Sequence, residues 1–144
     1  GCVHVAPQVS EYPTALDTYV QAPDSNYAWK IEKTIPGQGA TTYVLNMTSQ
    51  AWLTEKEVNR PVWTHWLVIE KPDKVTSNKA LLMISGGNVD SPPPDGMSDR
   101  AKGAAVATGS VVAELRGVPN EPLTFAGETA SRLARGPPEG TEGR

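Results

Sequence analysis

The chain has 144 residues, 38% of them hydrophobic and 20% charged, a composition that is ordinary for a globular domain with its own core. A formal net charge of −3 and scattered lysines and arginines exclude an electrostatic nucleic-acid binder, which would gather basic residues on one surface. The single cysteine and two histidines exclude an internal disulfide and give no basis for a metal site. We therefore expect no metal, no cofactor and no nucleic-acid partner.

The chain begins with Gly1 and Cys2. A small residue followed by cysteine is typical of a bacterial lipoprotein at its cleavage site, where the cysteine carries the lipid. Cys2 is therefore a lipidation candidate, and a chance cysteine is the alternative. Residues 1–26 are rich in Pro, Ser, Asp and Gln with little periodicity, so we predict a tail and linker there.

Residues 27–70 are predicted to form an antiparallel meander of strands, because apolar and polar residues alternate along them. A turn at 36–39 separates the first strand from a second at 43–48, and a third spans 62–70. The alternation in the first strand predicts one dry face, made by Trp29, Ile31, Lys33 and Ile35.

The character of the sequence changes at residues 80–84, a continuous apolar run that is typical of a strand buried on both faces. Ser98 is the predicted N-cap of an alanine-rich helix that Gly109 ends, and 110–115 predicts another strand. Strand, crossover helix and strand make a βαβ unit. The sequence therefore predicts an α/β fold with an incomplete sheet: an N-terminal antiparallel β-meander leading into a βαβ unit. An α/β-hydrolase sheet begins in this way.

A series of segments carries a resemblance to a known family, and these segments are 16–20, 27–30, 41–45, 49–52, 61–66, 80–87, 107–115 and 118–123. In this order they resemble the N-terminal part of the PhoPQ-activated pathogenicity-related family. The resemblance implies a longer, exported, virulence-associated protein of α/β-hydrolase-like fold, whose nucleophile serine lies on an elbow farther downstream. It fades at about Thr129, so we expect a domain at 27–127 and a disordered or aberrant tail at 128–144.

The sequence Ser85-Gly86-Gly87-Asn88 follows the predicted strand after which an α/β hydrolase places one donor of its oxyanion hole. Glycines let the backbone turn sharply and present N–H groups close to a ligand. Gly86, Gly87 and Asn88 are therefore oxyanion or ligand-binding candidates, and a tight turn at a strand end is the alternative. Ser85 has Met83 where the nucleophile elbow requires glycine, so it is interpreted as a structural hydroxyl.

Glu114 interrupts an apolar strand near its carboxyl end, the edge where α/β sheets bind ligands. It is a ligand-binding candidate, although pairing with Arg116 is favoured because buried carboxylates are usually paired. Asn120 is a weaker candidate of the same kind. His65 is interpreted as a packed residue and His4 as part of the tail, so no catalytic residue is assigned.

The tryptophans offer another kind of site, because exposed aromatic rings on a β-meander bind sugars or proteins. These residues are Trp29, Trp52, Trp63 and Trp66. Their alternation along the strands favours core packing instead, at least for Trp29 and Trp63.

The resemblance implies that the parent protein is a serine-type ester or amide hydrolase acting on a small-molecule or peptide substrate. This chain holds no catalytic triad, so we expect it to be an inactive N-terminal fragment. The alternative, for which the family offers precedent, is a non-enzymatic secreted binding or signalling protein on a hydrolase-like fold. The expected location is exported: periplasmic, or attached to the membrane through lipidated Cys2.

Overall fold

The computed structural model describes residues 13–128, so the predictions made for Cys2, His4 and the segment 129–144 lie outside the described residues. The described elements, in chain order, are α1 (Ala15–Gln21), β1 (Ala28–Pro36), β2 (Ala40–Ala51), β3 (Val62–Pro72), β4 (Leu81–Ile84), α2 (Asp99–Thr108) and β5 (Val112–Arg116).

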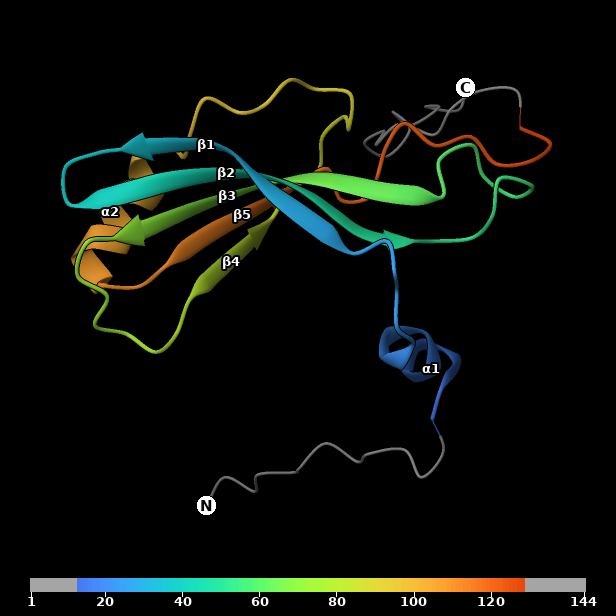
Figure 1. Cartoon of the computed structure of the whole chain (residues 1–144), viewed down its shortest axis with the longest axis horizontal. Helices are drawn as coiled ribbons and strands as arrows, with labels where there is room; N and C mark the ends of the chain where they lie inside the picture. The colour runs from blue at the N-terminus through green and yellow to red at the C-terminus, as the bar shows by residue number, and fades with distance from the viewer. Residues whose placement is uncertain (1–12, 129–144) are drawn as a thin grey trace, which may run out of the picture.

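A single five-stranded sheet organises the fold, with its strands in the order β1-β2-β3-β5-β4 (Figure 1). β1, β2 and β3 pair antiparallel as a meander, and β3 pairs antiparallel with β5. β4 and β5 lie side by side in parallel, with α2 between them in the chain. The structure therefore confirms the predicted meander and the βαβ unit that follows it, and it leaves β4 at the edge of the sheet.

Helix α2 begins and ends at the predicted residues. The Ser98 Oγ accepts a hydrogen bond from the Ala101 N–H at 3.3 Å, which satisfies one free amide of the first turn. Gly109 ends the helix in the left-handed conformation with φ of 62°. A β-carbon on Gly109 would collide with the Thr76 side chain, so this position requires glycine for both reasons.

The core of the domain lies between α2 and one face of the sheet. Small side chains on the helix allow it to approach closely, and Ala105 is fully buried. The buried residues of this core are Val44, Val68, Met97, Ala101, Ala105 and Val112.

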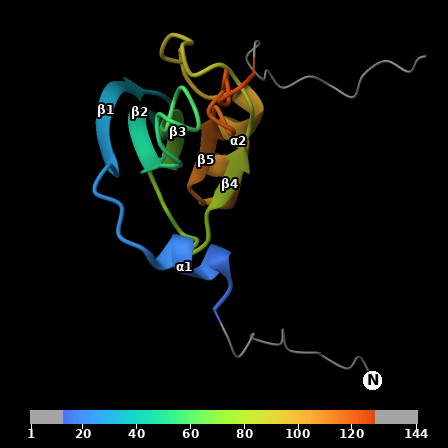
Figure 2. The same cartoon turned by 90° about the vertical axis from the view of Figure 1, so that its right-hand side faces the viewer.

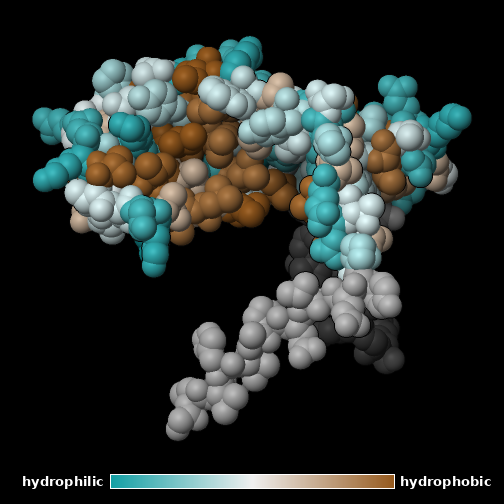
Figure 3. Space-filling view, turned by 60° about the horizontal axis from the view of Figure 1, so that its bottom comes forward, coloured by the Kyte–Doolittle hydropathy of each residue, from teal (hydrophilic) through white to brown (hydrophobic). Residues whose placement is uncertain are grey.

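No described helix packs on the opposite face of the sheet, which we call the open face. The cross-strand register places apolar residues of every strand there: Trp29, Ile31, Tyr43, Leu45, Met47, Leu67, Ile69, Leu82, Ile84 and Leu115. Figure 3 shows hydrophobic surface spreading over this side of the molecule. The prediction that β4 is buried on both faces is wrong, because only one face is covered and Leu82 and Ile84 remain 55% and 63% exposed.

Helix α1 lies below the sheet in both views, within the segment predicted to be a tail and linker (Figures 1 and 2). None of its residues is buried. The helix starts with a capping box, in which Thr14 Oγ1 accepts from the Asp17 N–H and the Asp17 carboxylate accepts from the Thr14 N–H at 2.8 Å. The sequence prediction missed α1 because its apolar residues pack against no core and so give no clear periodicity.

A β-bulge changes the faces predicted for β1. The register steps from Ile31 opposite Leu45 to Lys33 opposite Val44. Leu45 and Val44 point to opposite sides of β2, so Ile31 lies on the open face while Lys33 lies on the α2 face. The single dry face predicted for this strand is therefore wrong.

The tryptophans divide between surface and core. Trp29 is 57% exposed on the edge strand, so its predicted core position is wrong. Trp63 is half-buried and packs edge-on against Trp52, with ring centroids 5.7 Å apart. Trp52 also contacts Phe125 edge-on, whereas the Trp66 Nε1 donates to a backbone oxygen in the loop after β4. The rings of Trp52 and Trp63 therefore fill space between the sheet and its loops.

The open face predicts that a polypeptide of these residues alone associates and unfolds without a cooperative transition, because apolar side chains on it remain in contact with water. Size-exclusion chromatography with light scattering and differential scanning calorimetry measure both properties. Ile84→Lys is expected to reduce association. Val75→Lys, at an exposed loop residue away from the sheet, is the matched control and is expected to leave it unchanged. A monomer that melts cooperatively would contradict the prediction.

Candidate functional site

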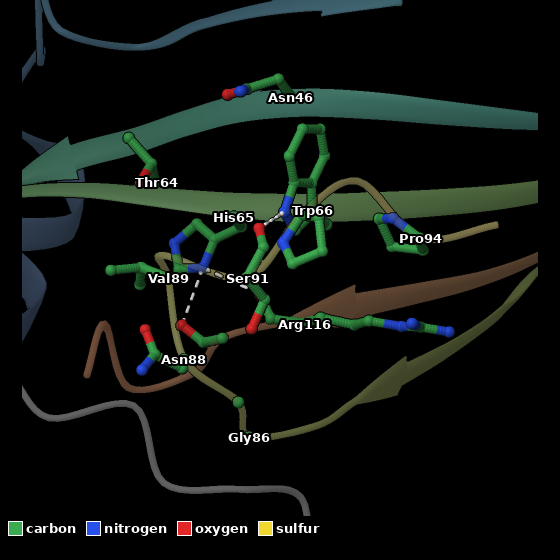
Figure 4. Close-up of a pocket in the computed structure, with 13 residues that line it drawn as sticks. Asn46, Thr64, His65, Trp66, Gly86, Asn88, Val89, Ser91, Pro94 and Arg116 are labelled. Atoms are coloured by element: carbon green, nitrogen blue, oxygen red, sulfur yellow. Dashed lines mark hydrogen bonds between the residues drawn. The ribbon is translucent and has the colours of Figure 1, made fainter. Parts of the chain in front are cut away.

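A cavity of about 270 Å³ opens where β4 and β5 end (Figure 4). We call it the loop cavity, because one wall is the loop formed by residues 86–88. The other walls come from His65 and Trp66 on β3 and from Arg116 and Gly117 at the end of β5. The carboxyl ends of parallel strands are where open α/β sheets bind ligands, so this cavity is the candidate functional site.

The loop presents bare backbone to this cavity. The N–H groups of Gly86, Gly87 and Asn88 donate no hydrogen bond to another described residue. Gly87 has φ of 139°, a region that favours glycine, and a β-carbon on Gly86 would meet no atom within 4 Å. The loop is fixed from behind, since the Gly117 N–H donates to the Gly86 oxygen at 3.3 Å and the Val118 N–H to the Ser85 oxygen at 3.1 Å.

The far end of the loop is held by side chains. The Asn88 Oδ1 accepts from the Asp90 N–H at 2.8 Å, which uses the Asn88 side chain to form the turn. Both carboxylate oxygens of Asp90 accept from the Arg60 guanidinium at 2.8 Å, and these hydrogen bonds lower the pKa of Asp90. The loop is therefore preorganised at both ends while its amides remain open.

The structure does not bring Glu114 into the loop cavity. Glu114 lies opposite Val68 and Met83 in the register, which places it on the α2 face of the sheet. Its Oε2 accepts from Arg116 at 2.9 Å, and its Oε1 accepts from the Ser85 Oγ at 3.1 Å. The carboxylate is thus paired with Arg116, as the structural alternative predicted, and Ser85 serves as its hydrogen-bond donor.

Asn120 lies in the loop after β5 and is only 1% exposed. Its Oδ1 accepts from the Thr64 N–H at 3.1 Å, and its Nδ2 donates to the Val62 oxygen at 3.3 Å. The side chain therefore ties this loop to β3 and has a structural role rather than the ligand-binding one considered from the sequence.

His65 is buried, 6% exposed, at the inner wall of the loop cavity. Its Nδ1 lies 3.0 Å from the Gly117 oxygen and 3.3 Å from the Arg116 oxygen, contacts drawn in Figure 4. Because carbonyl oxygens only accept, Nδ1 carries the proton. Burial lowers the pKa of His65, against the opposing effect of the two carbonyls, so the ring is held in its neutral form.

The Nε2 of His65 lies 2.8 Å from the Ser49 Oγ. With Nδ1 protonated, Nε2 is the acceptor and the Ser49 hydroxyl donates to it. The sequence interpretation of His65 as a packed residue is correct for its burial, but it missed Ser49. No local pattern marks this serine, because the contact depends on the pairing of β2 with β3.

Two classes of site are missing from residues 13–128. They contain no group of three His, Cys, Asp or Glu side chains arranged to hold a metal ion. Neither of their helices has the length and apolar character needed to cross a membrane.

The comparisons with known proteins agree with the resemblance seen in the sequence. The chain is 36% identical over 125 residues to the autocrine proliferation repressor protein A of Dictyostelium discoideum, an alignment that covers 86% of this chain and 25% of that protein. The chain thus spans about a quarter of the length of this relative. No solved structure matches it. The sequence model of the PhoPQ-activated pathogenicity-related protein family matches residues 16–134, which is most of the chain. The chain therefore belongs to the PhoPQ-activated pathogenicity-related protein family.

Proposed function

We propose that this chain is the N-terminal part of an exported α/β-hydrolase-like protein, and that the parent is a serine-type ester or amide hydrolase. The observation that carries this proposal is the loop cavity, where the amides of Gly86, Gly87 and Asn88 lie open at the carboxyl ends of parallel strands. Such amides are the donors with which hydrolases of this fold complete an oxyanion hole.

The arrangement of elements supports the same proposal. The loop follows the parallel strand β4 and precedes the crossover helix α2, behind an antiparallel meander. This is the position of the loop that supplies the second oxyanion donor in α/β hydrolases. The open face, which no described helix covers, and the edge position of β4 also fit a sheet that continues in the parent. The greater length of the Dictyostelium relative fits this as well.

In this function a serine downstream of residue 128 attacks the carbonyl carbon of the substrate. Negative charge then develops on the carbonyl oxygen, and in this proposal the N–H groups of Gly86, Gly87 and Asn88 donate to it. Full charge exists only in the tetrahedral intermediate, so these donors stabilise the transition state more than the bound substrate. The hydrogen bond from Gly117 to Gly86 holds the donors in place before substrate binds.

The name of the Dictyostelium relative, a proliferation repressor, favours a second candidate. In a non-enzymatic secreted binding or signalling protein, the same open amides would hold an anionic group of a small molecule or peptide. The two functions differ in whether a reactive serine accompanies the amides.

A serine-directed fluorophosphonate separates these candidates when it is applied to the folded full-length protein. A hydrolase is expected to become covalently labelled at a serine beyond residue 128, because the probe imitates the acyl group under attack. Mass spectrometry of the intact protein measures the label, and heat-unfolded protein is the control. Absence of label in folded protein would favour the binding function.

Gly87→Val tests the role of the loop. The valine side chain disfavours φ of 139° and is expected to move the amides, lowering kcat for a p-nitrophenyl ester by about 10²–10³-fold with little change in KM. Gly103→Ala, on the exposed side of α2 with no atom near its β-carbon, is the matched control. Unchanged kcat in a folded Gly87→Val protein would contradict the assignment.

Export and lipid anchoring at Cys2 form part of the proposal. Cys2→Ser in the full-length protein, expressed in a bacterium, is expected to move it from the detergent phase to the aqueous phase in Triton X-114 partitioning, because the lipid supplies the membrane affinity. Equal partitioning of both forms would show that Cys2 carries no lipid.

A further inference from the structure

Ser49 and His65 have the geometry of a serine nucleophile and its base. The Ser49 Oγ lies 2.8 Å from His65 Nε2, and His65 Nδ1 is held 3.0 Å from the Gly117 oxygen. The hydroxyl proton therefore points at the free lone pair of a base that a third group orients. An activated serine is recognised by this geometry and not by its position in the sequence.

Ser49 lies at a β-bulge in β2, next to His65. Thr48 lies opposite Thr64 and Gln50 opposite Trp63, which leaves Ser49 as the extra residue between two paired positions. Bulges redirect a side chain out of the regular alternation and are frequent next to active sites. Met47, two residues before Ser49, lies opposite His65 in the register, so Ser49 comes from the part of β2 that lies beside His65.

Ser49 also lines a second cavity of about 400 Å³, which we call the α1 cavity because Tyr19 and Val20 of that helix form part of its wall. A small molecule can thus approach Ser49, whereas His65 behind it is buried. The Tyr19 hydroxyl donates to Gln50 Oε1 at 2.8 Å, which leaves the Gln50 Nε2 as a hydrogen-bond donor in the same wall.

The α1 cavity is selective in charge. Asp24 forms part of its wall, and hydrogen bonds from the backbone amides of Ala51 and Asn26 lower the pKa of its carboxyl group. The ionised carboxylate disfavours an anionic group in the cavity. Uncharged or cationic acyl groups of modest size are the ligands that this surface accepts.

We propose that Ser49 and His65 form an acyl-accepting nucleophile–base pair for small uncharged or cationic esters, distinct from the downstream serine of the proposed function. Ser49 Oγ bonds to the ester carbonyl carbon while its proton moves to His65 Nε2. The bond from that carbon to the alkoxide oxygen then breaks, and the alcohol leaves with the proton. Acylated Ser49 remains, and water attacks it with the same base to release the acid. The buried, neutral state of His65 keeps Nε2 free to accept the proton.

Fluorophosphonate labelling of the folded full-length protein, followed by trypsin digestion and mass spectrometry, tests the pair. The tryptic peptide 34–56 contains Ser49 as its only serine and is expected to carry the label. Ser49→Ala removes the acceptor, and His65→Gln keeps a side chain able to hydrogen-bond but unable to take the proton. Labelling of this peptide is expected to disappear in the first and to slow by about 10²-fold or more in the second.

Ser110→Ala is the matched control, since this partly buried serine lies in neither cavity. In the Ser110→Ala protein, the 34–56 peptide is expected to become labelled at the original rate. If Ser49→Ala fails to fold, Ser49→Cys keeps a nucleophile of similar size. Its thiol is expected to react with iodoacetamide, and at least tenfold more slowly once His65→Gln is added.

The outcomes separate this proposal from the preceding one. Label confined to a serine beyond residue 128 overturns the Ser49–His65 pair and leaves the hydrolase proposal standing. Label on the 34–56 peptide that persists at full rate in folded His65→Gln overturns the role of His65. No label anywhere in the folded protein overturns both proposals.

Discussion

Helix α2 lies close on one face of the sheet because Ala101 and Ala105 present nothing larger than a methyl group to the strands beneath them. Both are buried against valines of β2, β3 and β5. This contact fixes the crossover that sets β4 parallel to β5, and it thereby aligns the two carboxyl ends. The loop that leaves β4 and the backbone that leaves β5 then meet at one edge. The candidate site depends on that meeting, since Gly117 hydrogen-bonds to Gly86 there.

The same contact covers only one side of the sheet. The other side presents apolar residues from every strand, and no described strand pairs with the outer edge of β4. Parallel strands normally occur in sheets that are covered on both faces, because the crossovers place helices there. Among residues 13–128, the sheet of this chain is covered by a helix on one face only. This supports the proposal that the chain is the first part of a longer hydrolase-like domain.

His65 connects the two cavities at the end of the sheet. Through Nδ1 it is bound to Gly117, whose own N–H is bound to Gly86, and through Nε2 it is bound to Ser49. A single chain of hydrogen bonds thus runs from the carbonyl oxygen of Gly86 in the loop to the serine in the bulge of β2. Because each donor and acceptor in it is used, the imidazole has one tautomer and one orientation. The backbone that shapes the loop cavity therefore also sets the base beside Ser49.

The sequence by itself determined the order and type of most elements, because their signals are local. Alternation marked the meander, Ser98 and Gly109 marked the ends of α2, and the ordered segments identified the family. The open loop at Gly86 was also found from the sequence, since its glycines follow a strand. Only the tertiary structure decided which surfaces are covered, and it left Trp29 and β4 exposed because burial depends on what packs against a strand. It also decided the bulges and the contact of Ser49 with His65, because register is a property of two strands together and not of either sequence alone.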